Sequence, residues 1–548
     1  MQSKLNEISK ATLALIPRAV KTAALVGQNA AQIGMEYSHL SPNCQQTRFP
    51  NTRRFLQFTE DKTKTSWDAI IVTGQIAQFT ETSQLLAKFI KVLDTAGVLI
   101  FECRNPYHFK QLEQKLNLSS NPDPNLIQAI LAKAENYSKK ITAAFKASGY
   151  EIDRLVRVKD NRSQEWINSS GLREALPDKI YQRLTKVCSS LAFLFRLTPI
   201  KHPQFRIQAK ILQPVGGVND VRVNFPLAAL QTIPGVQIHI SQNQSIKAVK
   251  QQGIEKVFLW QRPVMTFEHS VPVIQQLRAA GYLIIVEFDD HTSPWPAIEE
   301  NNYLTFAGAH AVQTTNQSMA NFIRNHNPEV GIFPNQLHHF PSRDLTVPAE
   351  AAGIFFGALN RKEDYKTLLP CINGALNELK ERFHFHVVGD EYFFENLRTD
   401  HKSFHPRGSY QEYLNVLIKA DIALMPLADT EFNRLKSDLK MVEAAGCGAV
   451  PIASAVVYEQ TDLQRDFSEI CSEDNEFVSA LIKLVNNPDI RLEKQKKGRE
   501  YVQSNRMLSD HCQSRYQWLS NLITRRNELD QALASRLQKI LPNDCINR

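Results

Sequence analysis

Short apolar runs alternate with amphipathic runs along the first 200 residues of the chain. Five of these runs have the composition of buried strands, and one has helical period. The strands are expected at residues 23–26, 67–73, 97–103, 152–158 and 192–197, and the helix at residues 82–93. This pattern predicts a doubly wound α/β sheet with an antiparallel end.

Two further series of the same kind follow. The first starts near Phe205 with a strand, a glycine loop and a helix, and the second starts at Gly353. Their later strands are expected at residues 256–260, 282–288, 311–315, 354–358, 383–388, 422–426 and 449–453. A polar stretch with prolines at residues 336–350 is typical of a linker between the two series. We therefore predict three α/β domains, covering residues 1–204, 205–345 and 346–548.

The length and composition are those of an ordinary globular protein with several domains. A chain of 548 residues is too long for one core and predicts roughly three to four domains. The net charge is +8, from 64 basic and 56 acidic residues. That mild excess suits an anionic small ligand or a membrane-surface substrate, and it does not indicate nucleic acid binding. The eight cysteines stand singly, without zinc spacing, as in a reduced cytosolic protein. No signal peptide or membrane span is expected, so we predict a cytoplasmic location.

Residues 432–454, FNRLKSDLKMVEAAGCGAVPIAS, carry the most specific chemical signal in the chain. Ser437 or Asp438 is expected to cap the helix that follows directly. The helix is expected to end at two glycines, Gly446 and Gly448, before a strand. A helix N-terminus gathers unpaired N–H groups and positive dipole, which suits a diphosphate.

Three side chains near this N-terminus have the chemistry for a nucleotide. Lys436 lies beside it, and Lys440 and Glu443 are expected to be exposed near the start of the helix. The lysines and the amides after Ser437 would hold a diphosphate, and Glu443 would accept hydrogen bonds from ribose hydroxyls. The alternative is an ordinary helix–strand unit with a solvated lysine face.

The segment resembles the donor site of GT-B glycosyltransferases related to families 1 and 4. Glu443 stands at the place of the ribose-binding Glu of that family, before Ala-Ala-x-Gly and a strand with proline. The retaining branch carries a second Glu eight residues earlier, where this chain has Leu435. Other junctions of the family are matched in the same order by Gly216-Gly217, Phe333-Pro334-Asn335 and Gly389-Asp390.

The resemblance implies two Rossmann-like domains that transfer a sugar from a nucleotide-diphosphate sugar without a metal ion or other cofactor. Resemblance to family 4 implies that the reaction retains the anomeric configuration of the transferred sugar. Leu435 is a departure from the sequence pattern of that retaining branch. Lys436 would meet charge on the departing diphosphate, and Arg361 is a second candidate for that role. Gly216 and Gly217 would turn backbone N–H groups toward a phosphate. The alternatives are a solvated Arg361 and glycines needed only for the turn.

Asp289 and Asp290 follow a buried strand, at the carboxyl edge where open α/β sheets bind ligands. We predict that they act as a base or orient the acceptor. The alternative is that they cap the next helix, with Trp295 packed below.

No metal site is expected. His384 and His386 share one face of a strand, a pattern more typical of packed residues than of ligands.

The first 200 residues resemble class I S-adenosylmethionine methyltransferases. The resemblance rests on residues 25–29, 67–71 and 94–97, which match the first loop, the fourth strand and the turn before the fifth strand. The departures fall on the cofactor site. Asn29 replaces the second loop glycine, Leu25 replaces an acidic residue, and no carboxylate follows the presumed second strand. We therefore predict a methyltransferase-like domain that is inactive and does not bind S-adenosylmethionine.

Together these patterns predict a glycosyltransferase that moves a sugar to an unknown glycan, lipid or protein acceptor. A bifunctional enzyme that also methylates is one alternative. A non-catalytic nucleotide-binding scaffold is another, and nucleotide-sugar epimerisation by a GT-B fold is a lesser one.

Overall fold

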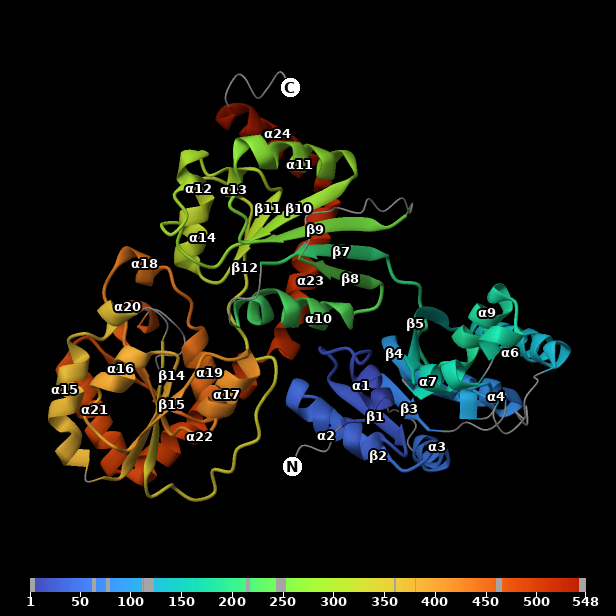
Figure 1. Cartoon of the computed structure of the whole chain (residues 1–548), viewed down its shortest axis with the longest axis horizontal. Helices are drawn as coiled ribbons and strands as arrows, with labels where there is room; N and C mark the ends of the chain where they lie inside the picture. The colour runs from blue at the N-terminus through green and yellow to red at the C-terminus, as the bar shows by residue number, and fades with distance from the viewer. Residues whose placement is uncertain are drawn as a thin grey trace. The chain divides into compact units, whose positions relative to one another are not determined.

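The computed structural model describes residues 5–61, 66–74, 79–110, 112, 123–160, 162–170, 172–212, 217–242, 253–358, 361–379, 381–459 and 466–541. The chain divides into two compact units, and each is described by itself. Unit 1 is Met1–Pro203 with Gln231–Gly235, and unit 2 is Gln204–Leu230 with Val236–Arg548. Figure 1 labels their elements along the chain. Unit 1 contains one sheet and unit 2 contains two, while the two boundaries between the three domains expected from the sequence stay a prediction.

Unit 1 is built on a six-stranded sheet with the order β2-β1-β3-β4-β6-β5. The strands are β1 (Thr22–Gly27), β2 (Gln45–Phe49), β3 (Trp67–Thr73), β4 (Leu93–Arg104), β5 (Glu151–Lys159) and β6 (Ser190–Thr198). β1 to β4 pair in parallel, whereas β6 is antiparallel to both β4 and β5. The doubly wound sheet with an antiparallel end is confirmed. The resemblance of this unit to methyltransferases stays a prediction.

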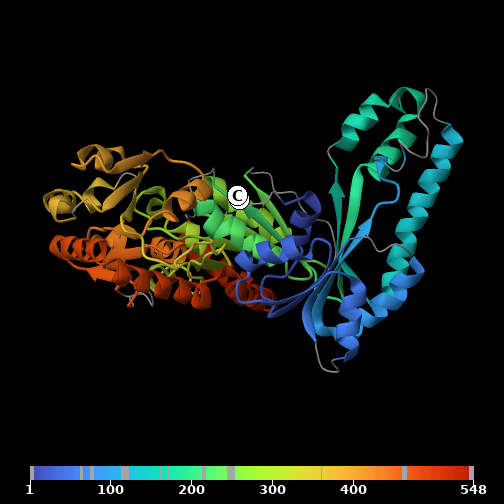
Figure 2. The same cartoon turned by 90° about the horizontal axis from the view of Figure 1, so that it is seen from below.

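Helices cover both faces of this sheet. They are α1 (Glu7–Leu13), α2 (Ala30–Leu40), α3 (Thr52–Asp61), α4 (Phe79–Val92), α6 (Pro124–Ala147), α7 (Arg162–Ser169), α8 (Leu172–Ala175) and α9 (Asp178–Cys188). Ile33 and Tyr37 of α2 pack with α1 on one face, and Ile141 and Phe145 of α6 pack on the other. Figure 2 shows the long α6 running beside the sheet.

Unit 2 contains two six-stranded sheets in which every pair is parallel. The N-half has the order β12-β11-β10-β9-β7-β8. Its strands are β7 (Phe205–Lys210), β8 (Val236–Ser241), β9 (Glu255–Gln261), β10 (Tyr282–Glu287), β11 (Ala311–Thr314) and β12 (Val330–Ile332). The C-half has the order β15-β14-β13-β16-β17-β18. Its strands are β13 (Ala352–Gly357), β14 (Phe383–Val388), β15 (Lys402–His405), β16 (Ile422–Met425), β17 (Val450–Ser454) and β18 (Glu469–Cys471). The C-half therefore has the Rossmann strand order, and the predicted fold class is confirmed.

Helices pack on both sheets of unit 2. In the N-half they are η1 (Asp220–Asn224), α10 (Phe225–Gln231), α11 (Phe267–Ala279), α12 (Ala297–Glu300), α13 (Leu304–Ala307) and α14 (Gln317–Arg324). In the C-half they are η2 (Lys362–Asp364), α15 (Leu368–Ala375), η3 (Leu376–Leu379), α16 (Glu391–Asn396), α17 (Tyr410–Leu417), α18 (Glu431–Arg434), α19 (Leu439–Cys447), α20 (Ala455–Tyr458), α21 (Asp474–Asn486) and α22 (Pro488–Asn505). The last two helices are α23 (Leu508–Thr524) and α24 (Arg526–Ile540). Leu533 and Leu537 of α24 are buried with Tyr282 and Ile284 of β10, so the chain returns to the N-half at its end (Figure 1).

The two halves of unit 2 meet at the start of α19. Asn316, before α14, donates from Nδ2 to the carbonyl oxygens of Leu435 and Lys436, at 3.2 and 3.1 Å. The carboxyl ends of β10 and β16 lead into the segments that carry the predicted site residues, as open parallel sheets generally arrange their ligand sites. Within the described residues, every helix is too short or too polar to cross a membrane.

Candidate functional site

Helix α19 is the centre of the candidate site. It starts directly after Asp438 and ends at Gly448, whose φ of 82° favours glycine, as the sequence predicts. The predicted cap is wrong, because the Asp438 side chain makes no capping hydrogen bond. Its carboxylate oxygens instead accept from Nη2 of Arg506, at 3.0 and 2.8 Å. Ser437 does not replace this cap in the described contacts, since its Oγ accepts from Nδ2 of Asn335 at 2.8 Å. Both residues therefore tie the start of the helix to neighbouring segments.

Gly446 has a different role from the predicted one. It lies inside α19 rather than at its end. A Cβ at this position would lie 2.6 Å from Cδ2 of Leu337 and 3.2 Å from Cγ1 of Val502. The glycine is required for close packing of the helix, and Gly448 alone provides the left-handed terminator.

Three cations gather around the start of α19. Burial, followed by the neighbouring Arg361 guanidinium, lowers the pKa of Lys436 to about 8. The same two causes lower the pKa of Lys440 to about 7, and Lys436 adds to the effect. Lys440 donates from Nζ to the carbonyl oxygen of Gly357 at 2.6 Å, which directs it toward the end of β13. Arg361 and Lys440 line one small cavity together with Tyr458. Two buried lysines with lowered pKa values beside a guanidinium form a place where an anion is stabilised.

Glu443 is not exposed as predicted. Only 2% of its surface is accessible, and its carboxylate accepts hydrogen bonds from two tyrosines of α17. Oη of Tyr410 lies 2.7 Å from Oε1, and Oη of Tyr413 lies 3.1 Å from Oε2. Burial raises the pKa of Glu443 to about 7, against the lowering effect of the two tyrosine hydrogen bonds. The carboxylate of Glu443 is therefore a buried hydrogen-bond acceptor near the cation cluster, and the two tyrosines fix its position.

The predicted glycine loop of the N-half reaches the same tyrosine. A Cβ on Gly217 would lie 2.4 Å from Cδ2 of Tyr410, so the absence of a side chain lets the two halves approach here. Phe225 of α10 also packs near this ring, with centroids 5.9 Å apart. Gly216 lies outside the described residues. Whether this loop binds a phosphate stays a prediction.

Asp289 and Asp290 lie at the carboxyl end of β10, as predicted, and bind Arg262. Oδ1 of Asp289 accepts from Nε of Arg262 at 2.5 Å, and Oδ2 of Asp290 lies 3.6 Å from Nη1. Burial raises the pKa of Asp289, but the Arg262 guanidinium outweighs this and holds the pKa below its usual value. Asp290 also faces the C-half, with Oδ1 3.7 Å from Nζ of Lys436. Asp290 thus lies between two cations, and it also accepts a hydrogen bond from the backbone N–H of His291 at 3.1 Å.

A buried polar network supports the junction of the halves. Arg222, in the π-helical turn η1, donates to Oε1 of Glu287 at 2.8 Å and to Oδ1 of Asn335 at 2.8 Å. Asn335 in turn donates to Ser437, and Arg506 donates to the Asn335 carbonyl at 2.8 Å. Asn335 is the last residue of the predicted Phe-Pro-Asn junction. The network connects the core of the N-half to the first residues of α19, and short π-helical turns are common at functional sites.

A cavity of about 430 Å³ lies between the halves. Asn316 and Pro334 line it from the N-half, and Arg434, Lys436 and Arg506 line it from the C-half. The cavity therefore adjoins the cation cluster and has basic walls.

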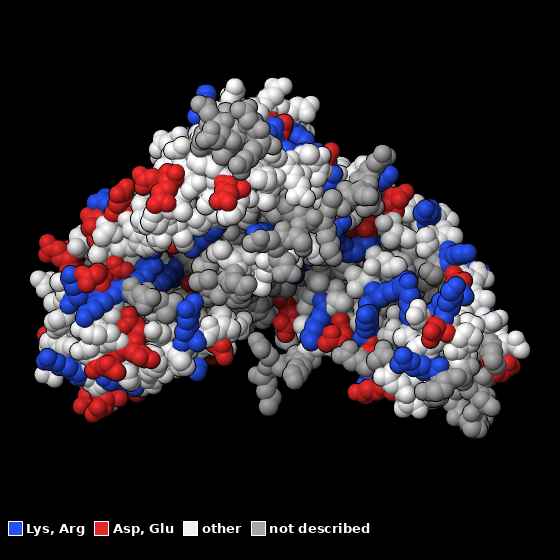
Figure 3. Space-filling model, turned by 45° about the horizontal axis from the view of Figure 1, so that its top comes forward, with Lys and Arg blue, Asp and Glu red and all other residues white. Residues whose placement is uncertain are grey.

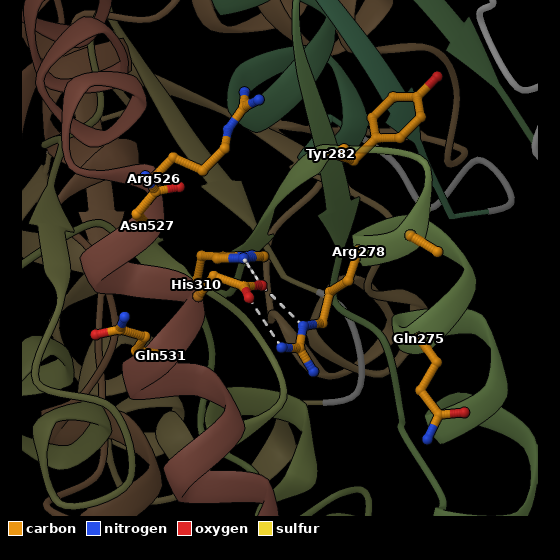
Figure 4. Close-up of a pocket in the computed structure, with 10 residues that line it drawn as sticks. Gln275, Arg278, Tyr282, His310, Arg526, Asn527 and Gln531 are labelled. Carbon is orange, nitrogen blue, oxygen red and sulfur yellow. Dashed lines mark hydrogen bonds and ion pairs between the residues drawn. The ribbon is translucent and has the colours of Figure 1, made fainter.

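A larger cavity of about 690 Å³ lies at the amino ends of β10 and β11, on the opposite edge from these residues (Figure 4). Arg278 of α11 donates to both oxygens of Asp530 of α24, at 2.8 and 2.9 Å. Nε2 of His310 lies 3.3 Å from the same carboxylate, and burial lowers the pKa of His310 to about 4. These groups bind one another and hold α24 on the N-half.

The histidines of β14 are packed beside a third one. His384 bonds Ser403 at 2.7 Å, and Nδ1 of His386 lies 3.4 Å from Nε2 of His405. No group of three or more metal-ligating side chains occurs among the described residues.

Several residues of the site could not be predicted from the 432–454 segment. Tyr410, Tyr413, Arg262 and Arg506 all lie far from it in sequence. The two tyrosines had a local signal, because Ser409 starts a capping box with a glutamate three residues on. Spacing of three on the resulting helix places both rings on one face.

Comparison with known proteins agrees with this geometry. Residues 371–519 match the family model described as "Glycosyl transferase-like", a range that contains α17, α19 and both lysines. The predicted resemblance to glycosyltransferases is therefore confirmed for this range of the chain. The methyltransferase-like nature of unit 1 stays a prediction.

The chain is also similar to several solved structures, among them the following three. TarM is 12% identical, with a TM-score of 0.37 over 48% of this chain and 54% of its own length. The catalytic domain of starch synthase IV from Arabidopsis thaliana, bound to ADP and acarbose, is 10% identical, with a TM-score of 0.43 over 59% of this chain and 100% of its own. HepE from Anabaena, in complex with UDP-glucose, is 12% identical, with a TM-score of 0.41 over the same shares, 59% and 100%. The chain spans about half the length of TarM. No curated protein matches the chain.

Proposed function

We propose that this glycosyltransferase takes its sugar from a nucleotide-diphosphate sugar bound at the junction of the N-half and the C-half. The acceptor would be a glycan, a lipid or a protein. The expected outcome is retaining, from the resemblance to family 4. Lys436, Lys440, Arg361 and the first amides of α19 would hold the diphosphate, so that protein donors rather than a metal ion meet its charge.

The cation cluster at α19 is the observation that carries this proposal. Lys436 and Lys440 have pKa values lowered to about 8 and 7, with burial as the first cause and Arg361 as the second. Three partly buried cations close together repel one another and lose hydration, which raises the free energy of the empty site. A bound diphosphate would lower that free energy through charge-assisted hydrogen bonds. An ordinary solvated lysine face would leave both pKa values near 10.5.

Glu443 is proposed to accept hydrogen bonds from the ribose. Its two oxygens already accept one bond each from Tyr410 and Tyr413. An ionised carboxylate has about four lone-pair sites, so two remain for ribose hydroxyls. The tyrosines would then orient the carboxylate toward the sugar of the nucleotide.

Asp290 is proposed to act on the acceptor or the transferred sugar. Its contact with Lys436 places it next to the proposed diphosphate site. Asp289 is tied to Arg262 in a nearly buried ion pair, with side-chain exposures of 10% and 12%, and we propose that it positions Asp290. Gly216 and Gly217 are proposed to approach the phosphates from the N-half.

Binding and turnover of nucleotide sugars test this function. Thermal unfolding is measured with a panel of nucleotide sugars and nucleoside diphosphates, because a ligand at 100 times its Kd stabilises by about 2.7 kcal/mol. Release of nucleoside diphosphate is then measured with the ligands that stabilise. Lys436→Ala should lower the turnover strongly and reduce the shift to a lesser degree, while Lys366→Ala, at an exposed surface ion pair, should keep both. Absence of any shift across the panel contradicts the proposal.

A non-catalytic nucleotide-binding scaffold is the second candidate. This function is favoured because both carboxylate oxygens of Glu443 already accept hydrogen bonds, from Tyr410 and Tyr413. Such a protein would bind nucleoside diphosphates and release none from any sugar donor. The release assay separates it from the enzyme.

Unit 1 is proposed to be an inactive methyltransferase-like domain that ends near residue 204, with the later boundary near residue 345. Asn29 stands in its predicted cofactor loop, and no carboxylate follows β2 in the sequence. Calorimetry of the whole chain with S-adenosylmethionine should show no binding at high micromolar cofactor. Clear micromolar binding would favour the bifunctional enzyme.

The free cysteines of the described residues fit the proposed cytoplasmic location.

A further inference from the structure

Unit 1 contains a pocket of about 380 Å³ that none of the predicted roles uses. It lies between helices α6 and α9, over strands β5 and β6. The lining comes from the segment just after β4, from helices α6 and α9, and from strands β5 and β6. A volume of this size falls within the range of about 300–1,000 Å³ of small-molecule sites.

The floor of this pocket is apolar. Leu155 of β5 faces Phe195 of β6 across the antiparallel pair, and Arg157 faces Phe193. Directly opposed residues of an antiparallel pair lie on the same face of the sheet, so these four side chains form one surface. Leu155 remains 42% exposed, which is unusual for a leucine on a covered sheet. Apolar area in a concave site favours the burial of an apolar ligand.

Hydrogen bonds hold the walls in place. The buried Asn105 donates from Nδ2 to the carbonyl oxygens of Val187 and Ser190, at 2.8 and 2.6 Å, and so joins the end of β4 to the end of α9. Tyr137 of α6 donates to the carbonyl oxygen of Arg104 at 3.4 Å. The rings of Tyr107 and Tyr137 pack edge to face with centroids 6.1 Å apart. The pocket is therefore formed before any ligand enters.

The rim is positively charged. Lys139, Arg157, Arg183 and Lys186 surround the floor, and Glu135 is the acidic residue among the lining side chains. Glu135 forms an ion pair with Arg183. Within the described part of the chain, the other three cations form no ion pair. Figure 3 shows Lys and Arg side chains gathered on the surface of unit 1, on the right of the view. Three unpaired cations around an apolar floor complement a ligand with an apolar body and an anionic group.

We propose that this pocket binds a small amphipathic anion, with an apolar body on Leu155, Phe193 and Phe195 and a carboxylate, phosphate or sulfonate group at the rim cations. The pocket is separate from the predicted cofactor loop, which follows β1, because β3 lies between β1 and β4 in the sheet. The proposal is independent of the glycosyltransferase site and assigns unit 1 a ligand of its own.

Fluorescence of 8-anilinonaphthalene-1-sulfonate, an apolar aromatic sulfonate, tests the proposal on the whole chain. The parent protein should bind one equivalent, and Leu155→Asp should weaken binding at least tenfold, because it adds a carboxylate to the floor. Leu126→Asp is the matched control, since Leu126 is also on the surface of unit 1, at 43% exposure, but does not line the pocket. The double change Arg157→Glu/Lys186→Glu should also weaken binding tenfold or more, and Lys140→Glu should not.

Competition identifies the ligand class. Octyl phosphate should displace the probe, whereas octyl glucoside, with the same chain and no charge, should not at the same concentration. A nucleoside diphosphate should leave the bound probe in place. The proposal is overturned if the parent binds no probe, if Leu155→Asp binds it as the parent does, if octyl glucoside competes equally, or if the nucleotide displaces it. Circular dichroism and melting curves of each variant exclude probe binding to unfolded protein as the cause of a change.

Discussion

Nζ of Lys436 lies 3.7 Å from Oδ1 of Asp290, and this contact joins the C-half of unit 2 to its N-half. The carboxylate of Asp290 also lies 3.6 Å from Nη1 of Arg262. An ion pair that is only 13% and 22% exposed is screened less than a surface pair. The arrangement places a carboxylate beside a cation that is proposed to meet the diphosphate, and the two side chains can therefore be tested as a pair.

Asp290→Asn and Lys436→Ala should both lower turnover, and Lys436→Ala should also weaken nucleotide binding. Asp290→Asn is expected to lower turnover about a hundredfold, the lower limit for loss of an acid–base group, with nucleotide affinity nearly unchanged. Lys436→Ala is expected to lower turnover by a similar factor and to weaken binding less, because its interaction strengthens as the leaving group gains charge. Steady-state kinetics and calorimetry with the nucleoside diphosphate measure the two effects. Equal losses of stability and activity in Asp290→Asn would indicate a purely structural carboxylate.

Glu443→Gln should weaken the binding of a nucleoside diphosphate about tenfold, since the charge-assisted bonds to ribose contribute roughly 1.5–3 kcal/mol and 1.4 kcal/mol is a factor of ten. It should also lower the free energy of unfolding by about 1–3 kcal/mol, because the buried amide N–H₂ would face a tyrosine hydroxyl. Titration calorimetry and urea unfolding measure these quantities.

Tyr410→Phe is the companion variant. It removes one hydrogen bond to Glu443 without adding an amide. Its affinity should fall less than that of Glu443→Gln if the carboxylate itself contacts the nucleotide. An unchanged affinity in Glu443→Gln would place the ribose elsewhere.

Gly217→Ala should destabilise unit 2. The new methyl group would lie 2.4 Å from the ring of Tyr410, whose hydroxyl is fixed on Glu443, so the ring or the glycine loop must move. Overpacking of this kind costs about 1–3 kcal/mol of unfolding free energy. Gly374→Ala is the control, because a Cβ there would meet no atom within 4 Å beyond the neighbouring residues and the backbone of its own helix, and alanine is the better helix former in α15. Equal melting temperatures for the two variants would contradict the close approach seen at Gly217.

The strands of all three sheets could be predicted where they lie in the interior. β10 is buried at all six positions, and its apolar run is visible in the sequence. β15 has no fully buried residue, and β8 has one, so neither shows a run of that kind. These two strands lie at sheet edges, where half of the side chains face solvent. β8 and β15 therefore remained outside the prediction, whereas β5, which also lies at a sheet edge, was expected at residues 152–158.

The local part of the site could be predicted, and its distant partners could not. The start of α19 and the place of Lys436 follow from the residues of one short segment. The burial of Glu443 does not, because it depends on Tyr410, 33 positions away, and on a helix whose last seven residues are all buried. Asp438 was likewise expected to cap the helix, but Arg506, 68 positions away, binds its carboxylate. Both predictions failed because the side chain binds a residue that is distant in the sequence.

Nucleotide affinity should fall as the pH rises above neutrality. The pKa of Lys440 is lowered to about 7 and that of Lys436 to about 8, so in the free protein Lys440 loses its charge around pH 7 and Lys436 around pH 8. A diphosphate favours their charged forms and raises both pKa values on binding. Binding near pH 8 must therefore take up protons, and the affinity should decrease between pH 7 and pH 9.5. Measurements begin at pH 7, above the second phosphate pKa of about 6, so that the ligand keeps its charge.

Calorimetry in two buffers of different ionisation enthalpy, such as phosphate and Tris, measures this proton uptake directly at pH 8. The parent protein should take up close to one proton for each nucleotide bound. Lys436→Arg/Lys440→Arg keeps both charges but does not titrate in this range, so it should bind without uptake and with an affinity that is flat between pH 8 and pH 9.5, above the pKa of about 7 of Glu443. Lys366→Arg, at the exposed pair with Glu363, serves as the control and should behave as the parent does. Proton uptake that persists in the double variant would show that another group titrates with the nucleotide, and the two lysines would then lose their place in the donor site.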